Sequence, residues 1–126
     1  MNIALWIAAG LLALVALGGG STKTFLSKEK LGNAKGGEWT AGFSAGAIRT
    51  LGILELLAAA GLILPAVLDI APILVPITAV CWVLLMIGAM ITHYRHNQVP
   101  LVAVNLVYLA LAVFIAWGRF ALEPFA

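Results

Sequence analysis

The stretch AGAIRTLGILELLAAAGLIL, residues 45–64, holds only two charged side chains, Arg49 and Glu55, in an otherwise apolar run. A bilayer has a hydrocarbon core roughly 30 Å thick, which about 20 apolar residues cross as an α-helix. Three further stretches of similar length hold no charge at all: 3–20, 72–92 and 99–117. Helices are expected because backbone groups in lipid need partners within their own segment, and no alternating barrel pattern is present. The sequence therefore predicts an all-α polytopic membrane protein, a bundle of four transmembrane helices.

The composition of the whole chain agrees with this prediction. Its 126 residues are 63% hydrophobic and 10% charged, against roughly 45–50% and 25% in soluble domains. A soluble domain of this size could not bury so much apolar surface. The net charge of +2 is too small to indicate a nucleic-acid partner, and the lone Cys81 excludes an internal disulfide. We expect a single membrane domain over residues 1–126.

Charged residues outside the spans are distributed unevenly between the two sides of the membrane. The loop 21–43 carries four lysines and the loop 93–98 carries Arg95, whereas the only positively charged side chain on the opposite side is Arg119, near the end of the chain. The lysines of the first loop are Lys23, Lys28, Lys30 and Lys35. The positive-inside rule then predicts an inner (plasma) membrane protein with cytoplasmic loops 21–43 and 93–98 and both termini outside.

The loop 21–43 also carries signals of local structure. Phe25, Leu26 and Leu31 between its charges predict an amphipathic segment at the membrane surface, which the glycines 36–37 interrupt. Ser44 is an expected N-cap of the second helix. Three consecutive glycines, 18–20, predict a flexible and closely packable end of the first helix.

Glu55 is the residue that most needs a physical explanation. It follows Ser44 by eleven positions, which places it roughly 16 Å along the helix and near the middle of the bilayer. Three of its four helical neighbours are small, namely Gly52, Ala58 and Ala59. Small residues are typical of faces on which another helix packs closely. Glu55 is therefore expected to face protein or a cavity, where its carboxylate must be neutralised, paired or hydrated.

Other polar side chains are expected on the cytoplasmic half of the same bundle. Arg49 lies on the same helix, six residues before Glu55, so a partner for Glu55 is expected from another helix or through water. The remaining candidates come from the other three helices: Lys23, His93, Asn105 and Tyr108. We expect these residues to form a ligand-binding polar pocket, open to the cytoplasm, with Glu55 as its floor. The alternative is that Glu55 only joins helices by hydrogen bonds.

Motifs for catalysis, metal binding and electron transfer are missing from the sequence. The glycines 18–20 lack the strand and lysine spacing of a phosphate-binding loop. Both histidines, His93 and His96, lie at a helix end rather than inside a span, which disfavours a haem. Cys81 with Met86 and Met90 lacks the spacing of a metal site. No cofactor is therefore predicted, although contact with a quinone or lipid is compatible with the expected pocket.

Several short motifs resemble the DoxX-like family of small four-helix membrane proteins. They are Gly-Gly-Ser-Thr-Lys at 19–23, Arg49-x-x-Gly52-x-x-Glu55, Gly-Leu-Ile-Leu-Pro at 61–65, the third helix ending at His93, and Val-Asn-Leu at 104–106. The family is named after a subunit of a thiosulfate:quinone oxidoreductase, and some relatives organise membrane-associated redox partners. The resemblance implies an accessory or ligand-binding subunit with a membrane or peripheral redox partner, and it carries over to Arg49, Gly52 and Glu55.

Two other functions are compatible with the same residues. One is a proton-coupled small-molecule transporter that works as a dimer, since four-helix exporters also carry a membrane glutamate, although in their first helix. The other is a membrane-protein assembly factor in which Glu55 is purely structural. The Gly42-x-x-x-Gly46 pair permits a homo-oligomer without requiring one.

Overall fold

The computed structural model describes residues 1–125, and within this range it contains helices and no strands. The elements are α1 (Asn2–Phe25), α2 (Lys28–Asn33), the 3₁₀-helix η1 (Gly37–Gly42), α3 (Ala45–Val67), α4 (Leu74–Arg95), α5 (Val99–Trp117) and a π-helical turn, η2 (Gly118–Leu122). The four long helices include the stretches expected to span the membrane, apart from residues 72–73, which precede α4.

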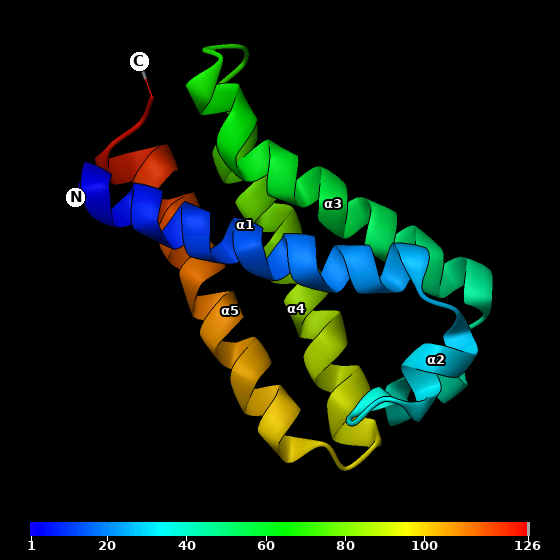
Figure 1. Ribbon diagram of the computed structural model, residues 1–126. Coiled ribbons are helices and arrows are strands. Elements are labelled where there is room, and N and C mark those ends of the chain that lie inside the picture. Colours follow the sequence, from blue (N-terminus) through cyan, green and yellow to red (C-terminus); the bar gives the residue numbers. More distant parts are fainter. Residues whose placement is uncertain (126) are drawn as a thin grey trace.

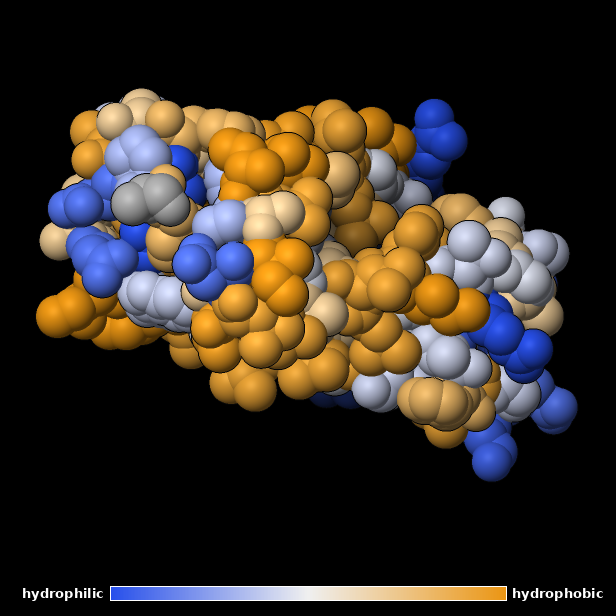
Figure 2. All heavy atoms as spheres, turned by 90° about the horizontal axis from the view of Figure 1, so that it is seen from above, coloured by the Kyte–Doolittle hydropathy of each residue, from blue (hydrophilic) through white to orange (hydrophobic). Residues whose placement is uncertain are grey.

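The protein is an integral membrane protein with four spans. Each of α1, α3 and α4, and α5 together with η2, is long and apolar enough to cross a bilayer. Large apolar side chains such as Ile3, Leu57 and Leu106 are more than half exposed. Figure 2 shows apolar side chains over the middle of this face and hydrophilic ones gathered toward its two ends. The predicted fold class is therefore confirmed.

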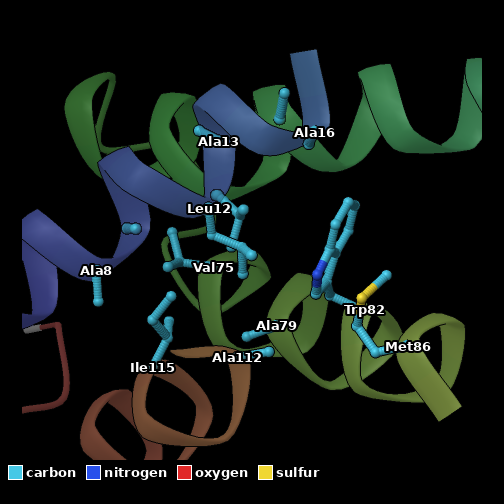
Figure 3. Packing of buried hydrophobic residues seen from close by; sticks show 13 residues of the cluster. Ala8, Leu12, Ala13, Ala16, Val75, Ala79, Trp82, Met86, Ala112 and Ile115 are labelled. Atoms are coloured by element: carbon cyan, nitrogen blue, oxygen red, sulfur yellow. The ribbon is translucent and has the colours of Figure 1, made fainter. Parts of the chain in front are cut away.

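Each of the four spanning helices packs against two others. Helix α1 contacts α3 and α5, and α4 contacts the same two helices from the other side. The α1–α3 pair and the α4–α5 pair meet near the two chain ends and diverge toward the end that carries α2 (Figure 1). Leu12, Val75 and Ile115 meet where the pairs are close (Figure 3), and all three are almost completely buried. The two helix pairs are thus packed together at one end of the bundle and are further apart at the other, which is called the wide end below.

Helix α1 is longer than the glycines 18–20 predicted. It continues to Phe25, and the last of these glycines, Gly20, lies in close contact with α3. A Cβ atom on Gly20 would lie 2.9 Å from the carbonyl oxygen of Gly52 on α3. Only residues without a side chain allow two helix backbones to approach so closely. The extension places Lys23, which was expected just beyond the helix, on its last full turn.

The connection between α1 and α3 has the local structure that its sequence predicts. The hydroxyl oxygen of Ser44 accepts a hydrogen bond of 3.1 Å from the Ala47 amide, which confirms the predicted N-cap. Gly36 has a φ of 81°, a conformation that glycine adopts without strain, and it separates α2 from η1. Helix α2 and η1 lie between the diverging ends of the two helix pairs (Figure 1). This segment is therefore placed next to the wide end of the bundle.

Candidate functional site

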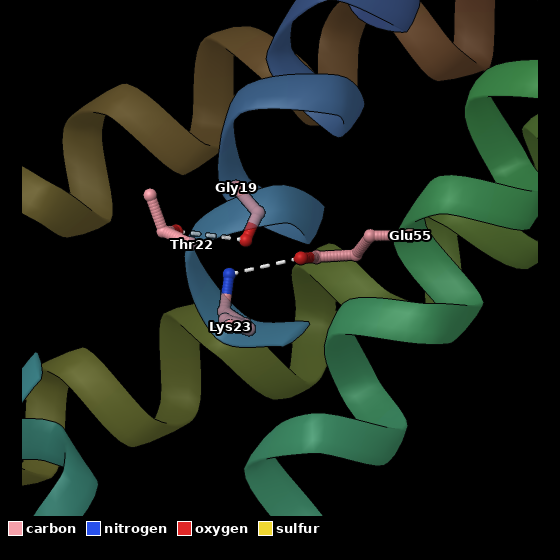
Figure 4. Close-up of polar contacts among 4 residues, drawn as sticks. All are labelled: Gly19, Thr22, Lys23 and Glu55. Atoms are coloured by element: carbon pink, nitrogen blue, oxygen red, sulfur yellow. Dashed lines mark hydrogen bonds and ion pairs between the residues drawn. The ribbon is translucent and has the colours of Figure 1, made fainter. Parts of the chain in front are cut away.

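Glu55 is paired with a lysine from another helix. Its carboxylate oxygens accept hydrogen bonds of 3.1 and 3.0 Å from Nζ of Lys23. The two side chains point toward one another from α1 and α3 (Figure 4). Glu55 is only 6% exposed, so its charge is compensated within the protein. The pair lies close to Gly19, where a Cβ atom would come within 3.4 Å of both Lys23 Nζ and Glu55 Oε2.

A cavity of about 560 Å³ lies beside this ion pair. Residues from all four spanning helices and from the segment around η1 form its walls. The walls are mostly apolar, with the charges of Lys23 and Glu55 set among leucines, glycines and aromatic rings. Pockets that bind small molecules are commonly of this volume, with apolar walls and a few placed polar groups. The divergence of the two helix pairs therefore leaves room for a small molecule next to the buried charges.

The structure brings together five of the six residues that the sequence singled out. The five that line the cavity are Lys23, Glu55, His93, Asn105 and Tyr108. Arg49 does not line it and is exposed on the surface of α3. Six residues correspond to roughly 240° of rotation around a helix, so Arg49 and Glu55 point in different directions. The second charge in this span thus lies outside the cavity.

Two residues of the cavity walls each have a buried nitrogen atom with no hydrogen-bond partner among residues 1–125. These atoms are Nε1 of Trp82 on α4 and Nδ2 of Asn105 on α5. Both residues are more than nine-tenths buried, at 2% and 8% exposure. A buried donor without a partner costs about 1–3 kcal/mol, so such groups usually have a function or a missing partner. Their presence in the cavity walls indicates an incomplete hydrogen-bonding arrangement.

Aromatic side chains line the cavity at its wide end, where the sequence predicted an opening to the cytoplasm. Trp39 of η1 lies beside His93, with ring centroids 6.3 Å apart, and Lys23 Nζ is 5.7 Å from the centroid of the Trp39 ring. Phe43 follows η1 and also lines the cavity. The wall at this end is therefore partly formed by the part of the loop that follows the glycines 36–37.

Gln98 attaches this aromatic segment to the turn between α4 and α5. Its amide nitrogen donates hydrogen bonds to the Gly36 carbonyl at 3.0 Å and to the Glu38 carboxylate at 2.6 Å. Its amide oxygen lies 2.8 Å from Nδ1 of His93. The contacts with Gly36 and Glu38 join residues about sixty positions apart in the sequence and hold the segment that carries Trp39 at the cavity wall.

Sequence reasoning missed Gln98, Trp39 and Trp82 as residues of the site. Trp82 has the apolar surroundings of a packing residue, and only its unpartnered nitrogen distinguishes it. The sequence Gly-Gly-Glu-Trp at 36–39 offered a weak signal, because an aromatic residue beside two glycines predicts a turn that presents a ring. The sequence around Gln98 offered no signal, since its partners Gly36 and Glu38 are distant in sequence.

The cavity residues include donors, one compensated ion pair and aromatic rings, and they are suited to holding a molecule. Among residues 1–125, no group of three or more histidine, cysteine, aspartate or glutamate side chains is placed to bind a metal ion.

The sequence profile of the DoxX-like family matches residues 7–115. No curated protein and no solved structure matches the chain. The matched range includes α3, α4, most of α1 and α5, and every residue that lines the cavity, and the chain belongs to the DoxX-like family.

Proposed function

We propose that this protein is a non-catalytic membrane subunit that holds a small amphipathic molecule, a lipid or a quinone, in the cavity beside Glu55. The observation that carries the proposal is the 560 Å³ cavity, in whose mostly apolar wall the buried Glu55 pairs with the partly buried Lys23. Charged groups inside a membrane are costly, and they are usually retained where they bind or move something. A partner with redox activity is the expectation that comes with the DoxX-like family.

A purely structural Glu55 is the second candidate, and one observation favours it. The ion pair joins α1 to α3 next to the close contact between Gly20 and Gly52, where it adds a polar link to an existing helix interface. An assembly factor would need no more than this link. The two candidates differ in whether a molecule occupies the cavity.

Substituting Glu55 by glutamine separates these candidates. The change removes the charge but keeps the size and one acceptor oxygen, so Lys23 retains a hydrogen bond. Without the Glu55 charge, the Lys23 ammonium beside the cavity is no longer compensated, which disfavours an apolar occupant. We therefore expect wild-type protein in native nanodiscs to carry a small molecule, detected by native mass spectrometry, and Glu55→Gln to carry at least about tenfold less. The matched control is Asp69→Asn, because Asp69 is exposed and lies outside the cavity.

Either of two results would contradict the proposal. The first is a wild-type protein that carries no molecule in any preparation. The second is a Glu55→Gln variant with an unchanged set of bound molecules but reduced thermal stability, which would favour the structural role. Proton-coupled uptake in proteoliposomes that disappears in Glu55→Gln would instead identify a transporter.

We also propose that the α2–η1 segment is cytoplasmic and that both termini lie outside. The lysines of this segment and Arg95 support the proposal through the positive-inside rule. Cys81 is free and exposed, so it is first replaced by alanine. In that background, a cysteine at position 28 should resist a membrane-impermeant maleimide added to intact cells, and one at position 69 should react. The reverse pattern would show that the orientation is inverted.

A further inference from the structure

The cavity is open on its sides at the depth of the bilayer. Leu14 on α1 and Leu84 on α4 line it, yet they expose 67% and 65% of their surface. Gly18 and Gly88 follow one turn later on each helix, also line the cavity and are exposed. Leu14 lies roughly 18 Å from the start of α1, near the middle of a bilayer. Surface exposed at that depth faces lipid chains, so a molecule dissolved in the bilayer reaches the cavity without passing through water.

The polar groups around the cavity favour a molecule that accepts hydrogen bonds. Both carboxylate oxygens of Glu55 already accept from Lys23. By contrast, Trp82 Nε1 and Asn105 Nδ2 are donors without partners. Carbonyl, ether and hydroxyl oxygens are the usual partners of such donors. A ligand with one of these groups would remove the cost of leaving the two donors unsatisfied, after small shifts of the two side chains.

The charges around the cavity favour a neutral ligand. Lys23 and Glu55 compensate one another, and Arg49 lies outside the cavity. A charged head group would therefore be an additional charge removed from water without a free partner, which is strongly unfavourable. The apolar walls offer contacts to a hydrocarbon tail.

From these three features we infer that the ligand is a neutral amphiphile, that it enters sideways from the bilayer, and that its head group accepts hydrogen bonds from Trp82 and Asn105. This inference rests on the proposed function and specifies its ligand class and route. A quinone with an alkyl tail and a diacylglycerol share this chemistry. The hydrocarbon tail of the ligand would lie beside Leu14 or Leu84, where the cavity opens to lipid.

Glycine-to-leucine substitutions test the route. A Cβ atom on Gly18 or Gly88 would meet no atom within 4 Å, so leucine at both positions narrows the lateral openings without a backbone clash. The matched control is Gly10→Leu with Gly46→Leu, because these glycines also have open space but do not line the cavity. In nanodiscs titrated with decylubiquinone or dioleoylglycerol, we expect the first double variant to bind about tenfold more weakly than the control.

Substitutions of the two donors test the recognition. Trp82→Phe and Asn105→Leu should each weaken binding of these neutral probes by roughly three- to tenfold, the loss expected for one hydrogen bond. Trp117→Phe is the control, since Trp117 is 55% exposed and does not line the cavity. Oleate, an anion with a similar tail, should bind more weakly than either neutral probe.

The outcomes separate this inference from the proposed function. Binding of decylubiquinone alone, or of dioleoylglycerol alone, supports the inference and identifies the source of the ligand. The inference is overturned if oleate binds more tightly than the neutral probes. It is also overturned if Trp82→Phe, Asn105→Leu and the double variant Gly18→Leu with Gly88→Leu all bind the neutral probes as tightly as their controls do. If wild type still carries a molecule that Glu55→Gln loses, the proposed function survives that result.

Discussion

Lys23→Met is expected to destabilise the protein by about 3–5 kcal/mol, the cost typical of removing one member of a buried ion pair. Glu55 would be left 6% exposed with no opposite charge beside it. Unfolding in mixed detergent micelles, followed by circular dichroism, measures this loss.

The double variant Lys23→Met with Glu55→Leu should recover most of the lost stability. Replacing both charges by apolar groups of similar size removes the desolvation cost together with the attraction, and such replacements are often neutral. The matched control is Lys30→Met, because Lys30 is exposed on α2 and its substitution should change stability by no more than about 0.5 kcal/mol. Equal stability of Lys23→Met and Lys30→Met would show that the ion pair contributes nothing to the fold.

The second large effect is expected at the contact between α1 and α3. Gly52→Ala should cost about 1–3 kcal/mol, and Gly52→Leu should cost more, because added carbon atoms force the two helices apart. A Cβ atom on Gly52 would lie 2.6 Å from the Thr24 amide nitrogen and 2.8 Å from the Gly20 carbonyl oxygen. Backbone atoms cannot rotate out of the way as a side chain does.

Gly46 provides a control on the same helix, where substitution by alanine should not lower the stability. A Cβ atom there would meet nothing within 4 Å, so Gly46→Ala should be neutral or stabilise the helix by up to about 1 kcal/mol. The same unfolding assay compares the two variants. Gly52→Ala should also weaken the energetic coupling between Lys23 and Glu55 in a double-mutant cycle, because separated helices hold the two side chains further apart. If Gly52→Ala and Gly46→Ala have the same stability, the close helix contact does not exist in the membrane.

The four spans could be predicted because each depends on a local property of the chain. A run of about 20 apolar residues is favourable in lipid whatever its neighbours are. Ser44 could be identified as a cap for the same reason, since its hydroxyl acts on an amide three residues away. The small residues around Glu55 also indicated correctly that this face packs against another helix.

The partner of Glu55 could not be selected in the same way. Lys23, His93, Asn105 and Tyr108 were equivalent candidates on the expected cytoplasmic half of the bundle. Lys23 lies opposite the carboxylate because α1 is helical as far as Phe25 and approaches α3 closely at Gly20 and Gly52. Arg49 was retained as a candidate because sequence spacing alone did not settle the shape of the pocket.

Four membrane crossings and an acid within one span can be inferred from the amino-acid sequence alone, because hydropathy and charge are properties of single segments. Three further features needed the folded protein: Lys23 pairs with this acid, Trp39 lines the cavity, and Gln98 ties the segment before Trp39 to the turn between α4 and α5. These features depend on the angle at which two helix pairs diverge. That angle is set by many contacts at once, including the core around Leu12, Val75 and Ile115, and no single stretch of sequence specifies it.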